Sequence, residues 1–264
     1  MNVIDNIVQN KFEQLIIKKD EKSLETIKKE AMDKVSTKKS HVFYDKLRKG
    51  NNTKLIAEYK PASPSQGKIN DTDVKTVINN YANEEVDLIS VLTEETYFNS
   101  CLENLVKAKQ ITSIPILRKD FLIDEYMIYE SALYGADCIL LINNIYSDIE
   151  KGLEICNNLG IDAIVECHTL DDLLSIKDFG AKIIGINNRN LENFSVNLET
   201  TKKLHEFIPD DVYCVSESGV KTSADAYTLK EYGANALLIG TSLLKKKGTS
   251  EQSKFIQELK RILK

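Results

Sequence analysis

The sequence alternates between short apolar runs and amphipathic segments, and this rhythm repeats eight times after residue 55. About 25 residues separate one apolar run from the next, which suits one strand, one helix and two short loops. Short apolar runs bounded by turn residues are typical of buried strands in a parallel sheet. We place the strands at 55–60, 87–93, 115–119, 138–142, 163–167, 183–187, 212–217 and 236–240.

The segments between these strands have helical patterns, and glycines near their ends mark helix stops. Gly135, Gly160, Gly180 and Gly233 each precede a predicted strand. Eight strand–helix units in succession favour the α/β class and a closed (β/α)8 TIM barrel, which 264 residues can fill as one domain. A doubly wound open sheet is the alternative, but it usually has fewer strands, and no G-x-G-x-x-G opens a helix here.

The first 47 residues differ from the rest of the chain. Their apolar residues recur at helical spacing, which predicts an amphipathic helix: Val3, Ile4, Ile7, Val8, Phe12, Leu15 and Ile16. A Lys- and Glu-rich stretch follows, in which we interpret residues 18–22 as a solvated helix face. We therefore expect residues 1–47 to form a helical extension that packs on a single catalytic domain, the barrel of residues 48–264.

Composition narrows the class of protein. The net charge of -5 argues against a general nucleic-acid binder, which is usually basic. The five cysteines are scattered without metal-type spacing, which indicates reduced thiols in a cytoplasmic protein. Cys138, Cys167 and Cys214 lie in apolar runs and should be core residues. No apolar run approaches the ~20 residues of a membrane helix, and the N-terminus does not resemble a signal peptide. We expect no metal and no organic cofactor.

Three of the predicted strands carry charged residues inside or at the end of an apolar run: LIAEYK, PILRKD and AIVECH. Side chains alternate across a strand, so Glu58 and Lys60 share one face. An ionised group on a packed strand costs several kcal/mol unless it is paired. The carboxyl ends of barrel strands, however, form a wet pocket where such groups are useful. Other strand ends contribute Arg118, Lys119, Asp120, Glu166, His168, Asn187, Asn188, Arg189, Glu217 and Ser218.

Lysines and glutamates at one barrel mouth supply both partners for proton transfer. A partly desolvated Lys has a lowered pKa and can act as an acid, and a Glu facing an aromatic substrate has a raised pKa and can act as a base. Stabilising ion pairs across the mouth are the alternative. His168 could face the same pocket, but we expect it to cap the strand end or bond a loop carbonyl. We leave it out of the chemistry.

The last two strands end in small residues. Ser218 and Gly219 follow one strand, and Gly240, Thr241 and Ser242 follow the other. Small residues let backbone N–H groups approach an anion, and a short helix after them adds its N-terminal dipole. This pattern favours a phosphate site, although the glycines could also serve only to make turns.

At these residues the chain resembles the indole-3-glycerol-phosphate synthase family of tryptophan biosynthesis. The matching motifs come in the family's order and cover about residues 50–245. They are IAEYKPASPSQG (56–67), VLTEETYF (91–98), PILRKDF (115–121), IVECH (164–168), IGINNRNL (184–191), VSESGV (215–220) and LIGTSLL (238–244). The N-terminal extension is also similar to the family's additional helix over the barrel mouth.

The resemblance implies the substrate 1-(2-carboxyphenylamino)-1-deoxyribulose 5-phosphate, closed to an indole with loss of carbon dioxide and water. It implies Lys119 as the general acid toward the ketone and Glu166 as the general base in dehydration. Lys60 would bind the substrate carboxylate or share acid duty. Glu58 and Asn187 would hold substrate hydroxyls and the lysines, and Glu217 and Ser218 would complete the polar ring. We expect Glu166 to face Lys60 and Lys119 across the substrate and to pair tightly with neither.

The resemblance also implies the residues that bind the substrate. Ser63, Gly219, Gly240 and Thr241 would receive the phosphate, and Arg189 would orient the substrate or loops. The slot for the anthranilate ring would be lined by Pro64, Phe98, Phe121 and Leu140. Partners would be this phosphorylated small molecule, no nucleic acid and no membrane, with association with other tryptophan-pathway enzymes possible in principle.

The chain departs from the family pattern at Pro61, at Gln66 and at Ser100-Cys101. These positions lie in predicted loops, so the departures concern loop motion more than the reaction. Phosphoribosylanthranilate isomerase is an alternative barrel, but its reaction needs a Cys/Asp pair at strand ends. A silent metabolite-binding barrel is another alternative, and it should have lost Lys119 or Glu166, both of which are present.

Overall fold

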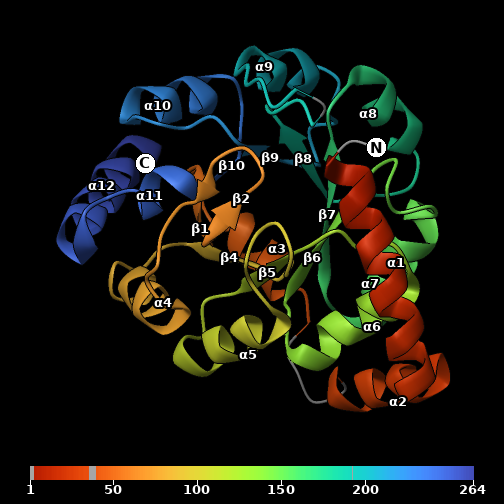
Figure 1. Cartoon of the computed structure of the whole chain (residues 1–264). Coiled ribbons are helices and arrows are strands. Elements are labelled where there is room, and N and C mark those ends of the chain that lie inside the picture. The colour runs from red at the N-terminus through yellow and green to blue at the C-terminus, as the bar shows by residue number, and fades with distance from the viewer. Residues whose placement is uncertain (1–2, 36–39, 192) are drawn as a thin grey trace.

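The computed structural model describes residues 3–35, 40–191 and 193–264, and its centre is a closed barrel of eight parallel strands (Figure 1). The strands are β1 (Lys54–Tyr59), β4 (Leu88–Leu92), β5 (Ile116–Lys119), β6 (Cys138–Ile142), β7 (Asp162–Cys167), β8 (Ile183–Asn187), β9 (Tyr213–Glu217) and β10 (Ala236–Ile239). Pairing of β1 with β10, in a register that sets Lys54 opposite Ala236, closes the ring. The predicted TIM barrel is confirmed, and the open sheet is excluded.

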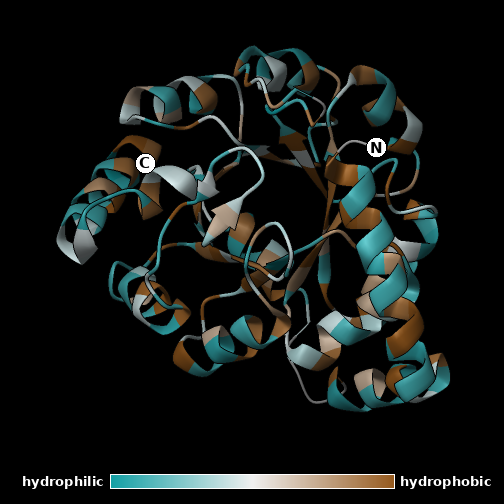
Figure 2. Cartoon of the chain, viewed as in Figure 1, coloured by the Kyte–Doolittle hydropathy of each residue, from teal (hydrophilic) through white to brown (hydrophobic). Residues whose placement is uncertain are grey.

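Helices follow the strands and form the outer ring of the barrel. They are α4 (Val74–Asn83), α5 (Leu102–Ile111), α6 (Glu125–Tyr134), α7 (Ile149–Leu159), α8 (Leu170–Ile176), α9 (Glu199–His205), α10 (Ser223–Glu231), α11 (Thr241–Leu244) and α12 (Gly248–Leu263). Two of them, α8 and α10, begin with capping boxes, in which Thr169 and Thr222 accept a backbone N–H of the first helical turn. Figure 2 shows hydrophobic colour along the central strands and polar colour over much of the outer helices.

The apolar core has two parts, as expected for strands buried on both faces. One part lies between the strands and the outer helices. The other fills the barrel interior with Ile56, Leu88, Leu117, Ile164, Val215 and Leu238. The predicted core cysteines Cys138, Cys167 and Cys214 are buried, as is Cys156.

Within residues 3–35 and 40–53, three helices precede the first strand: α1 (Val3–Glu21), α2 (Leu24–Val35) and α3 (Val42–Leu47). The ring of Tyr44 in α3 meets that of Tyr213 at the start of β9, and the Tyr44 N–H donates to Asp162 at the start of β7. Phe43 and Leu47 join the interior core. Helix α3 therefore covers the N-terminal ends of the strands, opposite the mouth where the charged residues gather.

Helix α1 lies along the mouth side of the barrel, where Lys18 contacts Glu130 of α6, and α2 packs against α6 (Figure 1). The apolar face predicted for α1 is only partly right. Ile7 and Leu15 are buried, but Phe12 and Ile16 have 55% and 64% of their surface exposed. The charged stretch is not simply a solvated face either, because Lys18 pairs with Glu130 at 2.6 Å.

A small hairpin in the loop after β1 was not predicted. It pairs β2 (Ala62–Ser63) with β3 (Gly67–Lys68) in antiparallel fashion. Two-residue strands leave no periodicity to detect, so the sequence carries no signal for them. Among the helices of the described residues, none is long and apolar enough to cross a membrane.

Candidate active site

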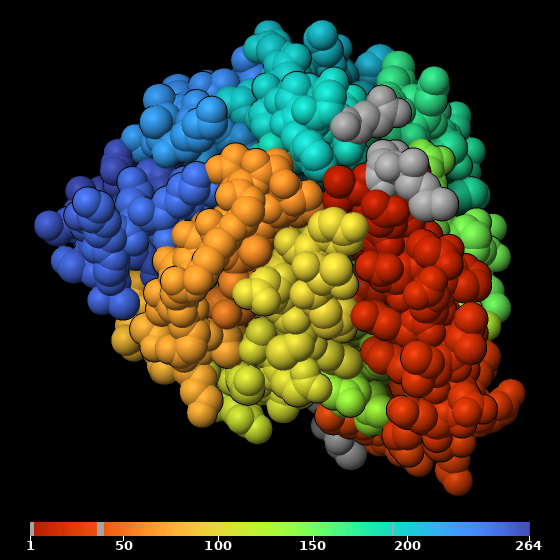
Figure 3. All heavy atoms as spheres, viewed as in Figure 1, coloured from red at the N-terminus to blue at the C-terminus, as the bar shows by residue number. Residues whose placement is uncertain are grey.

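Two adjoining cavities open at the carboxyl ends of the strands, with volumes of about 100 Å³ and about 400 Å³. Both are lined by Glu58, Lys60, Lys119, Asn187 and Arg189. Figure 3 shows the red helix α1, the orange loop after β1 and the yellow loop after β4 lying side by side over this mouth. Every residue that the sequence analysis selected as catalytic or substrate-binding lines one cavity or both. The strand ends therefore converge as the barrel topology requires.

The smaller cavity has an apolar side suited to a flat aromatic ring. The rings of Phe98 and Phe121 lie 6.0 Å apart between centroids and are inclined by 43°. Pro64 and Leu140 complete the slot as expected. The sequence analysis missed further lining residues, namely Ile4, Leu92, Ile142, Leu191 and Phe194. Ile4 belongs to α1, so the N-terminal extension forms part of the site.

Lys119, the last residue of β5, joins two carboxylates. Its Nζ atom lies 2.6 Å from Oε2 of Glu217 and 3.3 Å from Oε2 of Glu166. The Lys119 side chain is 17% exposed, and those of both glutamates are 2% exposed. The expectation that Glu166 pairs tightly with neither lysine is therefore wrong for Lys119. Alternate strands of the ring bring these side chains together, because β5, β7 and β9 each direct a side chain toward the barrel axis at this level.

This cluster sets the pKa of Lys119. Burial alone lowers the pKa of an ammonium, but the charges of Glu217, Glu166 and Glu58 outweigh burial and raise it above its ordinary value. The expected lowering of the lysine pKa is wrong in the unliganded site, because carboxylates and not cations surround the amine. Lys119 consequently carries its proton before the substrate arrives.

The two carboxylates that share Lys119 differ from each other. Burial alone raises the pKa of Glu166, but Lys119, His168 and a hydrogen bond from Asn187 hold it below its ordinary value. Burial raises the pKa of Glu217 to about 7, because Lys119 compensates only in part and Glu166 and Glu58 add repulsion. The raised pKa that the sequence analysis expected for a glutamate of the site is found at Glu217. Glu166 is ionised.

Glu58 on β1 holds the second lysine of the site. Its Oε2 lies 2.6 Å from Nζ of Lys60, which follows the strand. Gly240 makes room for this pair, since a Cβ there would lie 2.1 Å from the Glu58 Oε2 atom. A glycine is therefore required at position 240 to leave space for the Glu58 carboxylate, in addition to the phosphate that the sequence analysis placed beside it.

The side chain of His168 is directed toward Glu166. Its Nε2 atom is 3.1 Å from Oε1 of Glu166. Thr169 and Asp172 form the capping box of α8, and Asp172 also accepts the backbone N–H of His168. The expectation that the His168 ring bonds a loop carbonyl or caps the strand end is therefore wrong. The alternative allowed by its spacing from Glu166, a ring that faces the charged cluster, is the one observed.

The larger cavity is lined by the small residues after β9 and β10: Ser218, Gly219, Gly240, Thr241 and Ser242. Gly219 has a φ of 103°, a conformation that favours glycine. The buried hydroxyl of Ser242 has no hydrogen-bond partner within the described part of the chain, so it is free to bind a ligand. Lys245 and Lys246 also line the cavity and were missed by the sequence analysis, and Lys245 bonds Gln66 at 2.6 Å.

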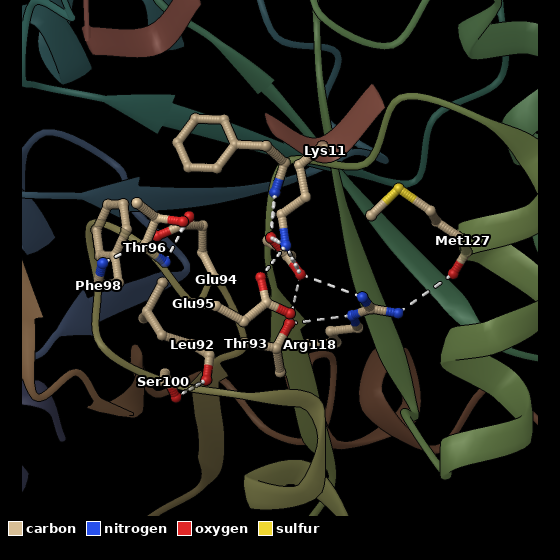
Figure 4. Close-up of polar contacts among 12 residues, drawn as sticks. Lys11, Leu92, Thr93, Glu94, Glu95, Thr96, Phe98, Ser100, Arg118 and Met127 are labelled. Atoms are coloured by element: carbon tan, nitrogen blue, oxygen red, sulfur yellow. Dashed lines mark hydrogen bonds and ion pairs between the residues drawn. The ribbon is translucent and has the colours of Figure 1, made fainter. Parts of the chain in front are cut away.

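Behind the aromatic slot lies a buried network of charges (Figure 4). Lys11 of α1 is 3% exposed and contacts Glu95 at 2.8 Å and Asp120 at 3.0 Å. Asp120 also accepts from Arg118 at 3.1 Å and from the Thr93 hydroxyl at 2.7 Å. Arg118 continues to Glu130 of α6 at 2.9 Å. Arg118 and Asp120, which flank Lys119, are thus fixed by helices on the outside of the barrel.

No group of His, Cys, Asp and Glu suited to a metal ion occurs among the described residues. The polar groups of the mouth are instead a cluster of ammonium and carboxylate groups. Such a cluster can move protons to and from a bound molecule.

Comparison with known proteins gives consistent matches. The family model described as "Indole-3-glycerol phosphate synthase" matches residues 4–259. Relatives of that name are 41% identical in Acetivibrio thermocellus, covering 98% of this chain and 100% of the relative, and 40% identical in Clostridium kluyveri, covering 98% and 99%. A solved thiamine phosphate pyrophosphorylase from Pyrococcus furiosus has a TM-score of 0.60 at 15% identity, covering 80% of this chain and 95% of that one. The last likeness concerns the fold alone.

Proposed function

The chain belongs to the indole-3-glycerol phosphate synthase family, and from that membership we propose how its residues perform the reaction. The activity is that of a carboxy-lyase. The ring of 1-(2-carboxyphenylamino)-1-deoxyribulose 5-phosphate closes, and indole-3-glycerol phosphate, carbon dioxide and water are formed. The observation that carries the proposed roles is the Lys119 ammonium, held between Glu166 and Glu217 at the border of the aromatic slot and the larger cavity.

Lys119 is the general acid for ring closure. Its raised pKa keeps it protonated, and substrate binding brings the ketone oxygen against the ammonium. Proton donation to that oxygen makes the ketone carbon electrophilic toward the ring carbon that bears the carboxylate. Once the carbon–carbon bond has formed, carbon dioxide leaves and the ring regains its aromaticity. Lys60 binds the departing carboxylate or shares acid duty, and Glu58 holds Lys60 in place.

Glu166 is the general base of the dehydration step. It is ionised, and it accepts a hydrogen bond from Asn187 while it contacts Lys119. When Glu166 removes a proton from the closed ring and an ammonium protonates the departing hydroxyl, water leaves and the indole forms. Asn187, Glu217 and Ser218 hold the substrate hydroxyls and keep the two lysines oriented. Proton transfers of this kind are each worth about 10²–10⁴ in rate.

The phosphate occupies the larger cavity. Gly219, Gly240 and Thr241 offer backbone N–H groups there, and the hydroxyls of Ser63 and Ser242 face the same mouth. Lys245 and Lys246 add positive charge at its outer rim. Pro64, Phe98, Phe121 and Leu140 then receive the anthranilate ring on the opposite side, and Arg189, which lines both cavities, orients the substrate between them.

We further propose that residues 48–264 act as one catalytic domain and residues 1–47 as an extension, whose helix α1 helps to cover the mouth. The five cysteines are free thiols, which supports a reducing cytoplasm as the place of action. Association with other enzymes of the tryptophan pathway is tested by co-elution of the purified enzymes.

The proposal is tested by mixing purified enzyme with the substrate in a stopped-flow cell after dialysis against a strong chelator. Indole fluorescence should rise at the same rate with and without the chelator, because the roles assigned here need no metal. Lys119→Met should abolish the rise, and Lys151→Met, which removes an exposed ion pair with Glu125, should not. A chelated enzyme that regains activity only with added Mg²⁺ or Zn²⁺ would overturn the assigned chemistry.

A further inference from the structure

Beside the two cavities of the active site, which together form the substrate cavity, lies a further cavity next to Glu166, the base of the proposed mechanism. We call it the second cavity. It has a volume of about 470 Å³ and opens between the loops that follow β6, β7 and β8. Its lining is rich in amides and hydroxyls: Asn143, Asn144, Thr169, Asn190, Ser195, Asn197 and Thr200. Glu166 lines the substrate cavity and His168 lines this second one. The two cavities adjoin and share part of their lining, and the 3.1 Å contact between the side chains of Glu166 and His168 links them.

The stoichiometry of the reaction requires a proton from solvent. The enzyme donates one proton to the ketone oxygen and a second to the departing hydroxyl, which leaves as water. The base recovers one proton from the closed ring. The carboxylate leaves as carbon dioxide and returns none, so each turnover consumes one proton net. Glu166 can hand its recovered proton to Lys119, 3.3 Å away, but the other must enter from outside.

The substrate cavity is poorly placed to admit that proton. The side chains of Glu166 and Glu217 are each 2% exposed, and α1 and the loops after β1 and β4 lie over the mouth (Figure 3). A bound substrate fills the remaining space. Lys119 and His168 are equally exposed before substrate binds, each at 17%. A substrate bound against Lys119 covers the ammonium, whereas His168 faces the polar second cavity, where several amides and hydroxyls can hold water.

We propose that His168 relays one proton per turnover from water in the second cavity to the Glu166–Lys119 pair. The imidazolium gives its Nε2 proton to Oε1 of Glu166, and the carboxyl passes a proton from Oε2 to the neutral Lys119 amine. A water of the second cavity then protonates the ring again. No other bond changes. The relay rests on the roles proposed above for Lys119 and Glu166, and His168 acts through Glu166 as a positioning residue.

The surroundings of His168 keep the imidazolium populated. Burial alone lowers the pKa of the ring, but the contact with Glu166 and the charges of Asp172 and Glu217 raise it above its ordinary value. These groups come from β7, α8 and β9. Arg189, from the loop after β8, lines the same second cavity, and its positive charge opposes protonation of His168. The raised pKa increases the fraction of His168 that is imidazolium, which is the form that can donate a proton to Glu166.

The first test is His168→Gln, because glutamine can still donate to Glu166 but cannot carry a proton. We expect an unchanged KM, a fall in kcat on the order of tenfold, and a larger solvent deuterium isotope effect on kcat. His168→Ala should regain turnover when imidazole is added. His205→Gln, whose ring packs against Gly233 on the outer surface, is the matched control and should behave like the wild type. Wild-type kcat, isotope effect and pH profile in His168→Gln would overturn the relay.

A second test does not depend on whether a His168 variant folds. The chain has three histidines, so the ring protons can be followed individually by NMR as pH changes. We expect the His168 midpoint to lie above about 6.5 and to drop in Glu166→Gln. A midpoint below that value in the wild type would exclude the relay. If Glu166→Gln is inactive while His168→Gln is normal, the proposed function stands and the relay fails; if the wild type does not turn over the substrate, the proposed function itself fails.

Discussion

The Nζ atom of Lys11 lies 3.0 Å from the carboxylate of Asp120, and this contact ties the first helix to the strand end that carries the proposed general acid. Asp120 stands between Lys119 and Phe121, one facing the proton-transfer cluster and the other the aromatic slot. Both partners are buried. Helix α1 therefore does more than cover the mouth, because its position and that of the end of β5 are set together.

Lys11→Met should lower the free energy of unfolding by about 1–3 kcal/mol, because Asp120 keeps Arg118 but loses its other cation. Lys22→Met is the matched control, since it removes an exposed pair with Glu30 on the same extension and should cost less than about 1 kcal/mol. Urea unfolding of the two variants measures the difference. Equal losses would mean that the buried contact adds nothing to stability.

Acid should weaken the fold through Asp120. Burial raises the pKa of this carboxyl, but Lys11, Arg118 and the Thr93 hydroxyl outweigh burial and lower it to about 2. A depressed native pKa gives stability that is complete above about pH 4 and is lost as pH falls through about 2. Asp120→Asn should therefore be less stable at pH 7 by about 2 kcal/mol and show a flatter stability curve between pH 4 and 2. Thermal melts at a series of pH values measure both effects.

Lys119→Met should reduce kcat by about 10²–10⁴, because the acid for ring closure is gone. It also leaves Glu166 and Glu217 buried without their shared cation, so their proton uptake should make the variant more stable as pH falls toward 6. Adding Glu217→Gln should restore stability at pH 8 without restoring turnover. A double variant that regains activity would show that Lys119 acts only by neutralising Glu217.

Glu166→Gln should separate the two halves of the reaction. The amide keeps the size and the contact with Asn187 but cannot take the proton in dehydration. In a single turnover, carbon dioxide release should proceed near the wild-type rate while indole fluorescence lags or fails to appear. Equal slowing of both signals would place Glu166 in ring closure as well, and normal rates for both would leave it a structural carboxylate.

Lys245→Met should raise KM by about threefold to tenfold with little change in kcat, because it removes one charge-assisted contact to the phosphate. Inorganic phosphate should raise the melting temperature of the wild type, since a ligand that binds the native state stabilises it, and should do so less in the variant. Lys247→Met, two residues along and outside the cavity lining, is the control. Identical phosphate effects in all three proteins would remove Lys245 from the phosphate site.

The barrel was predictable because each strand is an apolar run that ends in a turn residue, and every predicted strand boundary lies within one residue of the observed one. The same reasoning placed Lys119, Glu166 and Glu217 at one mouth. It could not say which of them touch, because contacts between strands distant in sequence depend on barrel stagger and rotamers. That is why it expected a free Glu166 and a lysine with a lowered pKa.

Other errors have equally local causes. The spacing of apolar residues in α1 does not reveal which side of the helix packs on the barrel. Lys11 is buried, but a hydropathy pattern treats every lysine as exposed and so cannot predict its burial. The prediction that Gly240 lies beside the phosphate stays a prediction, but its closeness to Glu58 on the neighbouring strand β1 was missed. A side chain on a neighbouring strand that is distant in sequence cannot be read from flanking residues.

The closure of β1 on β10 has a consequence for synthesis of the chain. The first strand leaves the ribosome long before the last, so β1 waits with one hydrogen-bonding edge bare until β10 emerges. Exposed edges of this kind pair readily with other nascent chains. Helix α1 can meet Glu95 and Asp120 as soon as β5 has formed, well before the ring shuts. The extension is thus available to shield the unfinished barrel while the remaining strands are made.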